Sequence, residues 1–215
     1  MAGRYEAVGI EAETEPGSRG RVLRNRLGLK RVRDIQQAES DALLAVQEWA
    51  LGHYSADHRF AAADLCGLHR RWLGEIYDWA GAYRTVNLDK GGVQFAAALQ
   101  IPRLMEDLER NELAAHTPCQ GMDRSRLIHA LAVTHGELVL IHPFREGNGC
   151  WARLLAWLMA LQAGLPPLDF APLAGRGRRA YFAAVRAVWD RDYEPLEARF
   201  EAVIRRTLRA LDPPA

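Results

Sequence analysis

The sequence has few cysteines and no long apolar run, and both absences exclude classes of protein. Its three cysteines, Cys66, Cys119 and Cys150, form no CxxC pair or other spacing typical of a zinc site, so we expect reduced thiols. No apolar run reaches the roughly 18 residues that a membrane-spanning helix needs. The first residues lack the charged-then-apolar pattern of a signal peptide, and we therefore expect a cytoplasmic protein.

The chain also lacks an excess of charge of either sign. Lys and Arg number 28 and Asp and Glu 27, and the net charge of +1 gives no long-range field that would attract nucleic acid. Basic residues do gather between residues 19 and 33, but apolar residues are interleaved with them, as in a segment that packs on a domain. We predict an arm over residues 1–33, whose first 20 residues are loose, and one domain over 34–215.

Helical periodicity dominates the rest of the chain. Asp34, followed three residues later by Gln37, is typical of a helix N-cap with a capping box. Alternating residue types around Lys90, Gly91 and Gly92 predict a short β-hairpin, a flap over about residues 84–96. The apolar spacing predicts helices over about residues 34–53, 62–79, 101–113, 123–141, 150–163, 177–190 and 193–211. The predicted fold class is all-α, a helical bundle with one short hairpin.

A segment between two predicted helices carries residues that a plain loop does not need. It reads HPFREGNGCWAR over residues 142–153. Gly147, Asn148 and Gly149 leave the backbone N–H groups of a helix start open to an anion, where the helix dipole adds positive potential. Arg153 lies one helical turn beyond Gly149, so its guanidinium can reach the outer oxygens of a phosphate held there.

Two further residues complete this candidate site. Glu146 would repel a bare phosphate unless a divalent cation lay between them, and Mg²⁺ prefers one or two carboxylates plus phosphate oxygens. His142 is the only group in the segment that takes a proton near neutral pH. These are the parts of a phosphoryl or nucleotidyl transfer site, in which positioning and charge stabilisation do most of the catalysis.

Each part also has an ordinary explanation when taken alone. A GNG triplet is usually a turn, and a single His before Pro is usually a capping or packing residue. Their combination in one short segment favours the transfer site. A metal site built from histidines is not favoured, because His129, His135 and His142 are spaced by six and seven residues and do not share one helix face. We interpret His129 and His135 as packing or polar residues.

The segment resembles the signature HPFx[D/E]GNGRxxR of Fic (Fido) domain proteins. It matches every specified position except one, where Cys150 replaces the first Arg. The resemblance extends to LRNRLG at 23–28, to LHRRWLGEIYDWAGAYRTVNLDKGG at 68–92 and to the tail at 181–204. It therefore covers most of the chain and implies a Fic-type helical bundle with a flap.

The resemblance implies a protein adenylyltransferase, which moves AMP from ATP onto a Ser, Thr or Tyr hydroxyl of a target protein. It implies that His142 is the general base and that Glu146 holds Mg²⁺. Phe144 would anchor the loop in the core. The phosphates would be held by Gly147, Asn148, Gly149 and Arg153. A target segment would add as a strand to the flap, whose docking residues are Lys90, Gly91, Gly92, Val93, Gln94 and Phe95.

Cys150 leaves three alternatives open. Loss of the Arg contact, worth about 1.5–3 kcal/mol for a charged hydrogen bond, predicts an attenuated enzyme. The substitution also fits a degenerate fold that only binds nucleotide or protein, or a transferase with another nucleotide donor. As a side chain, Cys150 is either a reactive thiol at a helix start or, as we favour, a passive small residue.

The family's internal inhibitor has no counterpart in these 215 residues. It is a glutamate in an [S/T]xxxE[G/N] helix, and no Ser or Thr here is followed four residues later by Glu. By resemblance this suits the toxin of a toxin–antitoxin pair, whose inhibitor is a separate small antitoxin.

Overall fold

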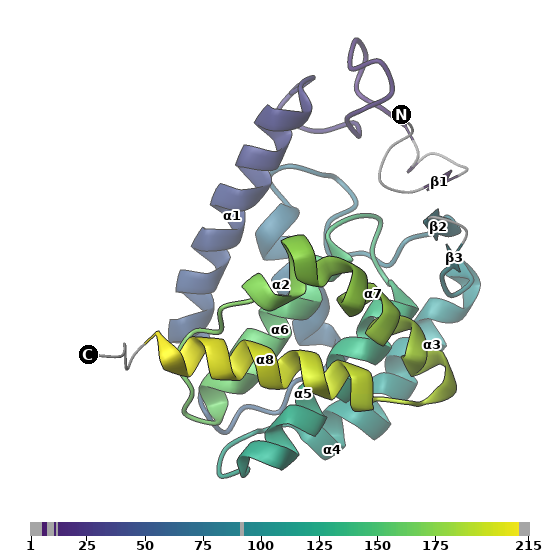
Figure 1. The fold of residues 1–215 in the computed structure, drawn as a ribbon. Coiled ribbons are helices and arrows are strands. Elements are labelled where there is room, and N and C mark those ends of the chain that lie inside the picture. Colours follow the sequence, from purple (N-terminus) through teal and green to yellow (C-terminus); the bar gives the residue numbers. More distant parts are fainter. Residues whose placement is uncertain (1–5, 8–10, 12, 91–92, 211–215) are drawn as a thin grey trace. The chain divides into compact units, whose positions relative to one another are not determined.

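The fold is almost entirely helical, as Figure 1 shows for a computed structural model that describes residues 6–7, 11, 13–90 and 93–210. The α-helices are α1 (Val32–His53), α2 (Ala62–Leu73), α3 (Ile101–Leu108), α4 (Ala114–His116), α5 (Arg124–Ile141), α6 (Asn148–Gln162), α7 (Arg178–Ala187) and α8 (Glu194–Arg209). The strands are β1 (Glu6–Ala7), β2 (Leu88–Lys90) and β3 (Val93–Gln94). The predicted fold class, all-α with a short hairpin, is confirmed.

The chain forms two compact units. The first contains Met1–His53, Ala61–Glu106 and Ile141–Asn148. The second contains Tyr54–Phe60, Asp107–Leu140 and Gly149–Ala215. The segment singled out by the sequence therefore contributes residues 142–148 to the first unit and residues 149–153 to the second.

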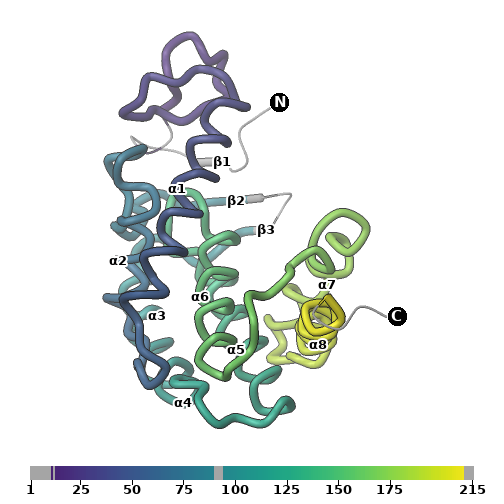
Figure 2. Tube along the Cα trace, turned by 90° about the vertical axis from the view of Figure 1, so that its left-hand side faces the viewer, coloured from purple at the N-terminus to yellow at the C-terminus, as the bar shows by residue number. Residues whose placement is uncertain are grey.

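In the first unit, α1 packs along α2 (Figures 1 and 2). The Trp72 indole donates to the Glu39 carbonyl at 2.8 Å, and the Tyr77 hydroxyl donates to the Glu39 carboxylate at 2.8 Å. The predicted N-cap at Asp34 is wrong, because α1 begins at Val32. Asp34 lies inside the first turn, where its carboxylate pairs with Arg31 at 2.6 Å and complements the helix dipole.

The helix predicted to reach residue 79 ends earlier, because α2 stops at Leu73. Arg26, in the N-terminal region, binds backbone carbonyls that would accept helical hydrogen bonds if the helix continued for another turn. Its guanidinium donates to the Gly74 carbonyl at 2.9 Å, and its N–H donates to the Ile76 carbonyl at 2.8 Å. The chain just beyond the helix is nevertheless buried, since Ile76 and Tyr77 are nearly inaccessible to solvent.

The hairpin predicted over residues 84–96 is present as β2 and β3. They pair antiparallel, with Asp89 opposite Gln94 and Lys90 opposite Val93. Gly91 and Gly92, predicted to form its turn, lie outside the described residues. β1 pairs antiparallel with β2 and makes a three-stranded sheet in the order β1-β2-β3 (Figure 2). The sequence did not predict β1, because a strand of two residues is too short to produce an alternating pattern.

In the second unit, α5, α6, α7 and α8 carry most of the buried apolar side chains. α5 is capped by Asp123, whose carboxylate accepts the Arg126 N–H at 2.9 Å. α3 continues into a π-helical turn (Glu109–Leu113) and α4, and α7 into a 3₁₀ turn (Val188–Asp190). α6 starts at Asn148, inside the GNG segment at 147–149, and not after it as predicted. Across the residues described, no helix is both long and apolar enough to cross a membrane.

Candidate active site

The loop after α5 holds His142 in an unusual backbone conformation. α5 ends at Ile141 because Pro143 follows and because His142 has a φ of 52°, in the left-handed region. The His142 side chain is 4% exposed, and its ring stacks on that of Phe95, with the ring centres 3.7 Å apart and 13° between their planes. Because Phe95 follows β3, the flap directly contacts the candidate general base.

Arg84, which lies just before the hairpin, holds this loop in place. The residue is 2% exposed, and its Nε donates to the His142 carbonyl at 2.8 Å. The terminal nitrogens donate to the carbonyls of Val86 and Ala96, each at 2.6 Å. Burial lowers the pKa of Arg84 to about 10, so the guanidinium stays charged at neutral pH.

Phe144 and Asn148 close the loop on itself. The Asn148 side-chain oxygen accepts the Phe144 N–H at 2.9 Å, and its amide nitrogen donates to the Phe144 carbonyl at 2.7 Å. Phe144 is fully buried and stacks on His69, with the ring centres 3.8 Å apart. The Asn148 side chain thus fixes the shape of the loop through the two backbone groups of Phe144.

His69 was not identified from the sequence, where it is one histidine within the apolar stripe of α2. Its Nδ1 accepts the Gly81 N–H at 2.9 Å, so Nε2 carries the hydrogen and donates to the Glu146 carbonyl at 3.1 Å. Burial lowers the pKa of His69 to about 4, which keeps the imidazole neutral. His69 therefore positions the backbone of Glu146 through a hydrogen bond that no sequence motif indicates.

Glu146 and Gly147 are held closely by the residues around them. Gly147 has a φ of 84°, and a Cβ there would lie 2.7 Å from the Trp72 ring, so only glycine fits. The Glu146 carboxylate, 8% exposed, accepts the Gly147 N–H at 3.0 Å. This backbone N–H therefore already binds an anionic oxygen.

A cation held by Glu146 would need further ligands, which a bound nucleotide and water can supply. Among the residues that the structure describes, no three His, Cys, Asp or Glu side chains gather as a metal site. Glu146 alone offers a carboxylate within the loop. Such a site matches Mg²⁺, which is commonly held by one or two carboxylates together with substrate phosphates and water.

The first turns of α6 carry the remaining predicted residues, in the second unit. The Arg153 guanidinium donates to Cys150 Sγ at 3.2 Å. It also lies near Gly149, where a Cβ would come 3.9 Å from Arg153 Nη1. Cys150 is thus the local partner of Arg153, a contact that the sequence did not suggest.

Beside α6, His135 and Tyr181 form a buried polar pair. The His135 Nε2 and the Tyr181 hydroxyl lie 2.8 Å apart. Burial, and then the charge of Arg153, lower the pKa of His135 to about 3. Burial raises the pKa of Tyr181 to about 12. Both side chains are therefore neutral, which agrees with the interpretation of His135 as a packing residue.

The structure thus brings the predicted residues together in two groups. His142, Glu146, Gly147 and Asn148 share the loop of the first unit, and Gly149, Cys150 and Arg153 share the first turns of α6 in the second unit. Among the predicted flap residues, Phe95 contacts His142, Gln94 is exposed, and Lys90 and Val93 pair through their backbones. Gly91 and Gly92 lie outside the described residues.

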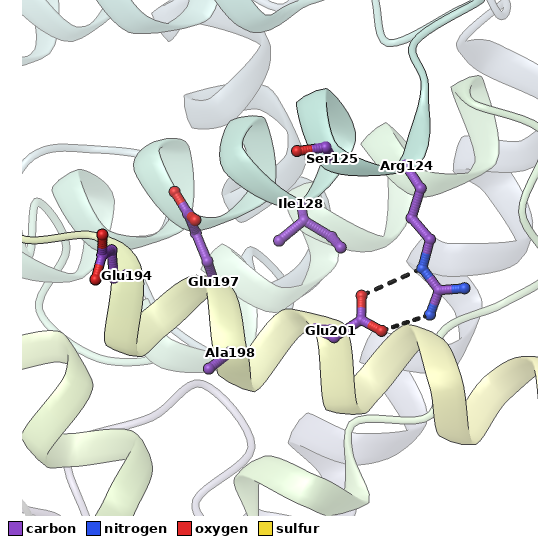
Figure 3. A pocket seen from close by; sticks show the side chains of 7 residues that line it. All are labelled: Arg124, Ser125, Ile128, Glu194, Glu197, Ala198 and Glu201. Atoms are coloured by element: carbon purple, nitrogen blue, oxygen red, sulfur yellow. Dashed lines mark hydrogen bonds and ion pairs between the residues drawn. The ribbon is translucent and has the colours of Figure 1, made fainter.

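A separate hollow of about 520 Å³ lies between α5 and α8 in the second unit. Figure 3 shows Arg124 on α5 reaching Glu201 on α8, with nitrogen–oxygen distances of 2.7 and 3.2 Å. The hollow is lined by Arg124, Ser125, Ile128, Glu194, Glu197, Ala198 and Glu201. These residues differ from those of the loop and carry no recognisable catalytic set.

Comparison with known proteins agrees with this fold. The family model described as Fic/DOC family matches residues 59–160. The Fic protein of Salmonella typhimurium is 32% identical over 149 residues, which cover 66% of this chain and 70% of that protein. The N-terminal Fic domain of a Bep effector protein from Bartonella quintana, solved with bound ADP, aligns with a TM-score of 0.67 and 25% identity over 84% of this chain and 89% of that chain.

The chain belongs to the Fic/DOC family. Another relative is the protein adenylyltransferase VbhT of Bartonella schoenbuchensis, which is 32% identical over 143 residues. That match covers 66% of this chain but 30% of VbhT, so the chain spans less than a third of that relative.

Proposed function

We propose that this chain is a protein adenylyltransferase, which transfers AMP from ATP to a Ser, Thr or Tyr hydroxyl of a target protein. The observation that carries the proposal is the loop itself, in which His142 and the Gly147 N–H are held in fixed positions immediately before α6. Family membership supports it, as do the name of VbhT and the ADP bound to the Bartonella quintana Fic domain.

In the proposed reaction, His142 takes the proton from the acceptor hydroxyl while that oxygen attacks the α-phosphorus of ATP. The bond between the α-phosphorus and the oxygen bridging to the β-phosphate breaks, and pyrophosphate leaves. His142 is buried and its ring stacks on that of Phe95, so its orientation is restricted, which is what a general base requires.

The phosphates are assigned to the start of α6. The backbone N–H groups of Gly147, Asn148 and Gly149 supply donors where the helix dipole is positive, and Arg153 supplies a cation one turn further on. Glu146 would hold Mg²⁺, which supplies positive charge to neutralise the phosphates. When the phosphates bind, the Glu146 carboxylate has to release the Gly147 N–H that it now occupies.

Cys150 is proposed to attenuate the reaction. An Arg at this position would add a charged hydrogen bond to phosphate, whereas the Cys150 sulfur accepts a hydrogen bond from Arg153. The proposed partners are the target protein, whose segment adds to the flap, and a separate small antitoxin. The antitoxin is supported by the lack of an [S/T]xxxE sequence within the chain.

The test is transfer of label from α-labelled ATP, CTP, GTP and UTP, with Mg²⁺, to the protein itself and to lysate proteins. We expect label from ATP, and its loss in His142→Ala, because a general base contributes about 10²–10⁴-fold to the rate. Binding of ATP without any labelling by wild type would overturn the proposal and favour a nucleotide-binding module. Labelling from another nucleotide only would identify a different donor.

A further inference from the structure

We propose that Arg84 is a positioning residue for AMP transfer, which fixes the backbone of His142 to both ends of the flap hairpin. The inference rests on the proposed function, and it deepens it by assigning a role outside the signature. It means that the segment to which a target docks and the general base behave as one rigid body.

The contacts of Arg84 join three parts of the first unit. Its Nε binds the carbonyl of His142, and its terminal nitrogens bind the carbonyls of Val86, before β2, and Ala96, after β3. A further contact joins Nη2 to the Ile141 carbonyl at 3.4 Å. One buried side chain therefore ties the entry and the exit of the hairpin to the residue that carries the catalytic imidazole.

The backbone of His142 requires such a partner. A non-glycine residue in the left-handed region is strained and persists only where its surroundings enforce it. The Arg84 N–H also donates to the Pro143 carbonyl at 2.9 Å, so the peptide groups on both sides of Pro143 are held by the same residue. Releasing them would let the His142 ring turn away from an acceptor hydroxyl.

Phe95 makes a second connection between the flap and His142. It directly precedes Ala96, whose carbonyl Arg84 binds, and its ring stacks on the imidazole. If this end of the hairpin moved, it would therefore displace both the backbone of His142, through Arg84, and its ring, through Phe95. The planar guanidinium suits this task, because it presents five donors in a fixed fork, whereas a lysine presents one nitrogen.

The N-terminal region supplies a negative charge to this buried cation. Electrostatic attraction from Glu11 opposes the effect of burial on the pKa of Arg84. The Glu11 carboxylate accepts the Thr85 N–H at 3.0 Å and the Thr85 hydroxyl at 2.8 Å, while the Glu11 carbonyl accepts Arg145 Nε at 2.7 Å. Glu11 thus links the residue after Arg84 to the loop.

The test compares Arg84→Lys with Arg33→Lys, a matched change at an exposed arginine of α1. The rate of label transfer from saturating α-labelled ATP to lysate proteins is measured beside the dissociation constant for ATP. We expect Arg84→Lys to lower the rate about a hundredfold, the effect of a misplacement near 1 Å, with ATP affinity unchanged. Arg33→Lys should change neither.

Two results would overturn the inference, namely a wild-type rate in Arg84→Lys or a parallel loss of ATP affinity, which would indicate a general structural role. Failure of the proposed function looks different, because then wild type itself transfers no label. If Arg84→Lys loses its cooperative thermal transition, Arg84→Ala is assayed with millimolar guanidinium chloride. Recovery of transfer with guanidinium, but not with ammonium chloride, supports the inference, and its absence contradicts it.

Discussion

The loop at residues 142–148 and the hollow between α5 and α8 both carry charged and polar side chains, but they use them differently. Asn148 in the loop and Arg84, which binds the loop, are almost fully buried and bind backbone carbonyl and N–H groups. In the hollow, Arg124 and Glu201 pair with each other, with side chains 50% and 39% exposed. Buried polar groups lose most when a partner is removed, so the loop is expected to tolerate far less change than the hollow.

The largest expected effect is at Gly147. Gly147→Ala places a Cβ 2.7 Å from the rigid Trp72 ring at a φ of 84°, and we expect a loss of about 3 kcal/mol in stability and about a hundredfold in transfer rate. Gly164→Ala is the matched control, because its φ is 79° but its Cβ would meet nothing within 4 Å. That control should cost about 1 kcal/mol and leave transfer unchanged.

Chemical denaturation and the labelling assay measure both quantities. Equal losses of stability in the two variants would show that the backbone conformation, and not the contact with Trp72, makes glycine necessary at Gly147. The close packing between loop and α2 would then not distinguish this region from the rest of the chain.

A smaller effect is expected from pH, through His135. The folded protein holds the pKa of His135 at about 3 by burial and by the charge of Arg153, whereas the unfolded chain takes up the proton near the ordinary value of 6.5. Between these values the unfolded state binds more protons, so stability falls as the pH is lowered through this range and is constant above it. From pH 7 to pH 5 the expected loss through this group is about 2 kcal/mol.

Urea denaturation at pH 7 and pH 5 checks this, with His135→Gln as the comparison. The variant should lose less stability than wild type over the same interval, by about the same 2 kcal/mol, whatever its stability at pH 7. An identical pH dependence in both proteins would contradict the assignment of a neutral, buried His135.

The comparison of loop and hollow also shows what the sequence could predict. Long helices were found because their apolar period repeats over many residues, and the hairpin was found because residue types alternate around the glycines at 91 and 92. The end of α2 and the strand β1 were missed, since both depend on contacts with the N-terminal region that no local pattern encodes. The end of α2 and the pairing of β1 are thus decided by tertiary hydrogen bonds.

For the candidate site, the residues of the signature were identified but the residues that hold them were not. Arg84 and His69 donate hydrogen bonds to the backbone carbonyls of His142 and Glu146. Every residue has a backbone carbonyl, so the type of the accepting residue does not reveal such a bond. Cys150 was recognised as a departure, yet its contact with Arg153 required the fold of α6. A sequence motif therefore identifies residues that contact a ligand more readily than residues that hold those residues in position.

The smallest expected effect is in the hollow. Arg124→Ala removes both hydrogen bonds to Glu201, but water replaces them at these half-exposed side chains, and we expect a change of at most about 1 kcal/mol in stability. Transfer of label should be unchanged, and raising the salt concentration should shrink the difference from wild type further, because exposed charges are screened. A loss of several kcal/mol, or a reduced transfer rate, would mean that this ion pair constrains α5 and α8 as firmly as the buried contacts constrain the loop.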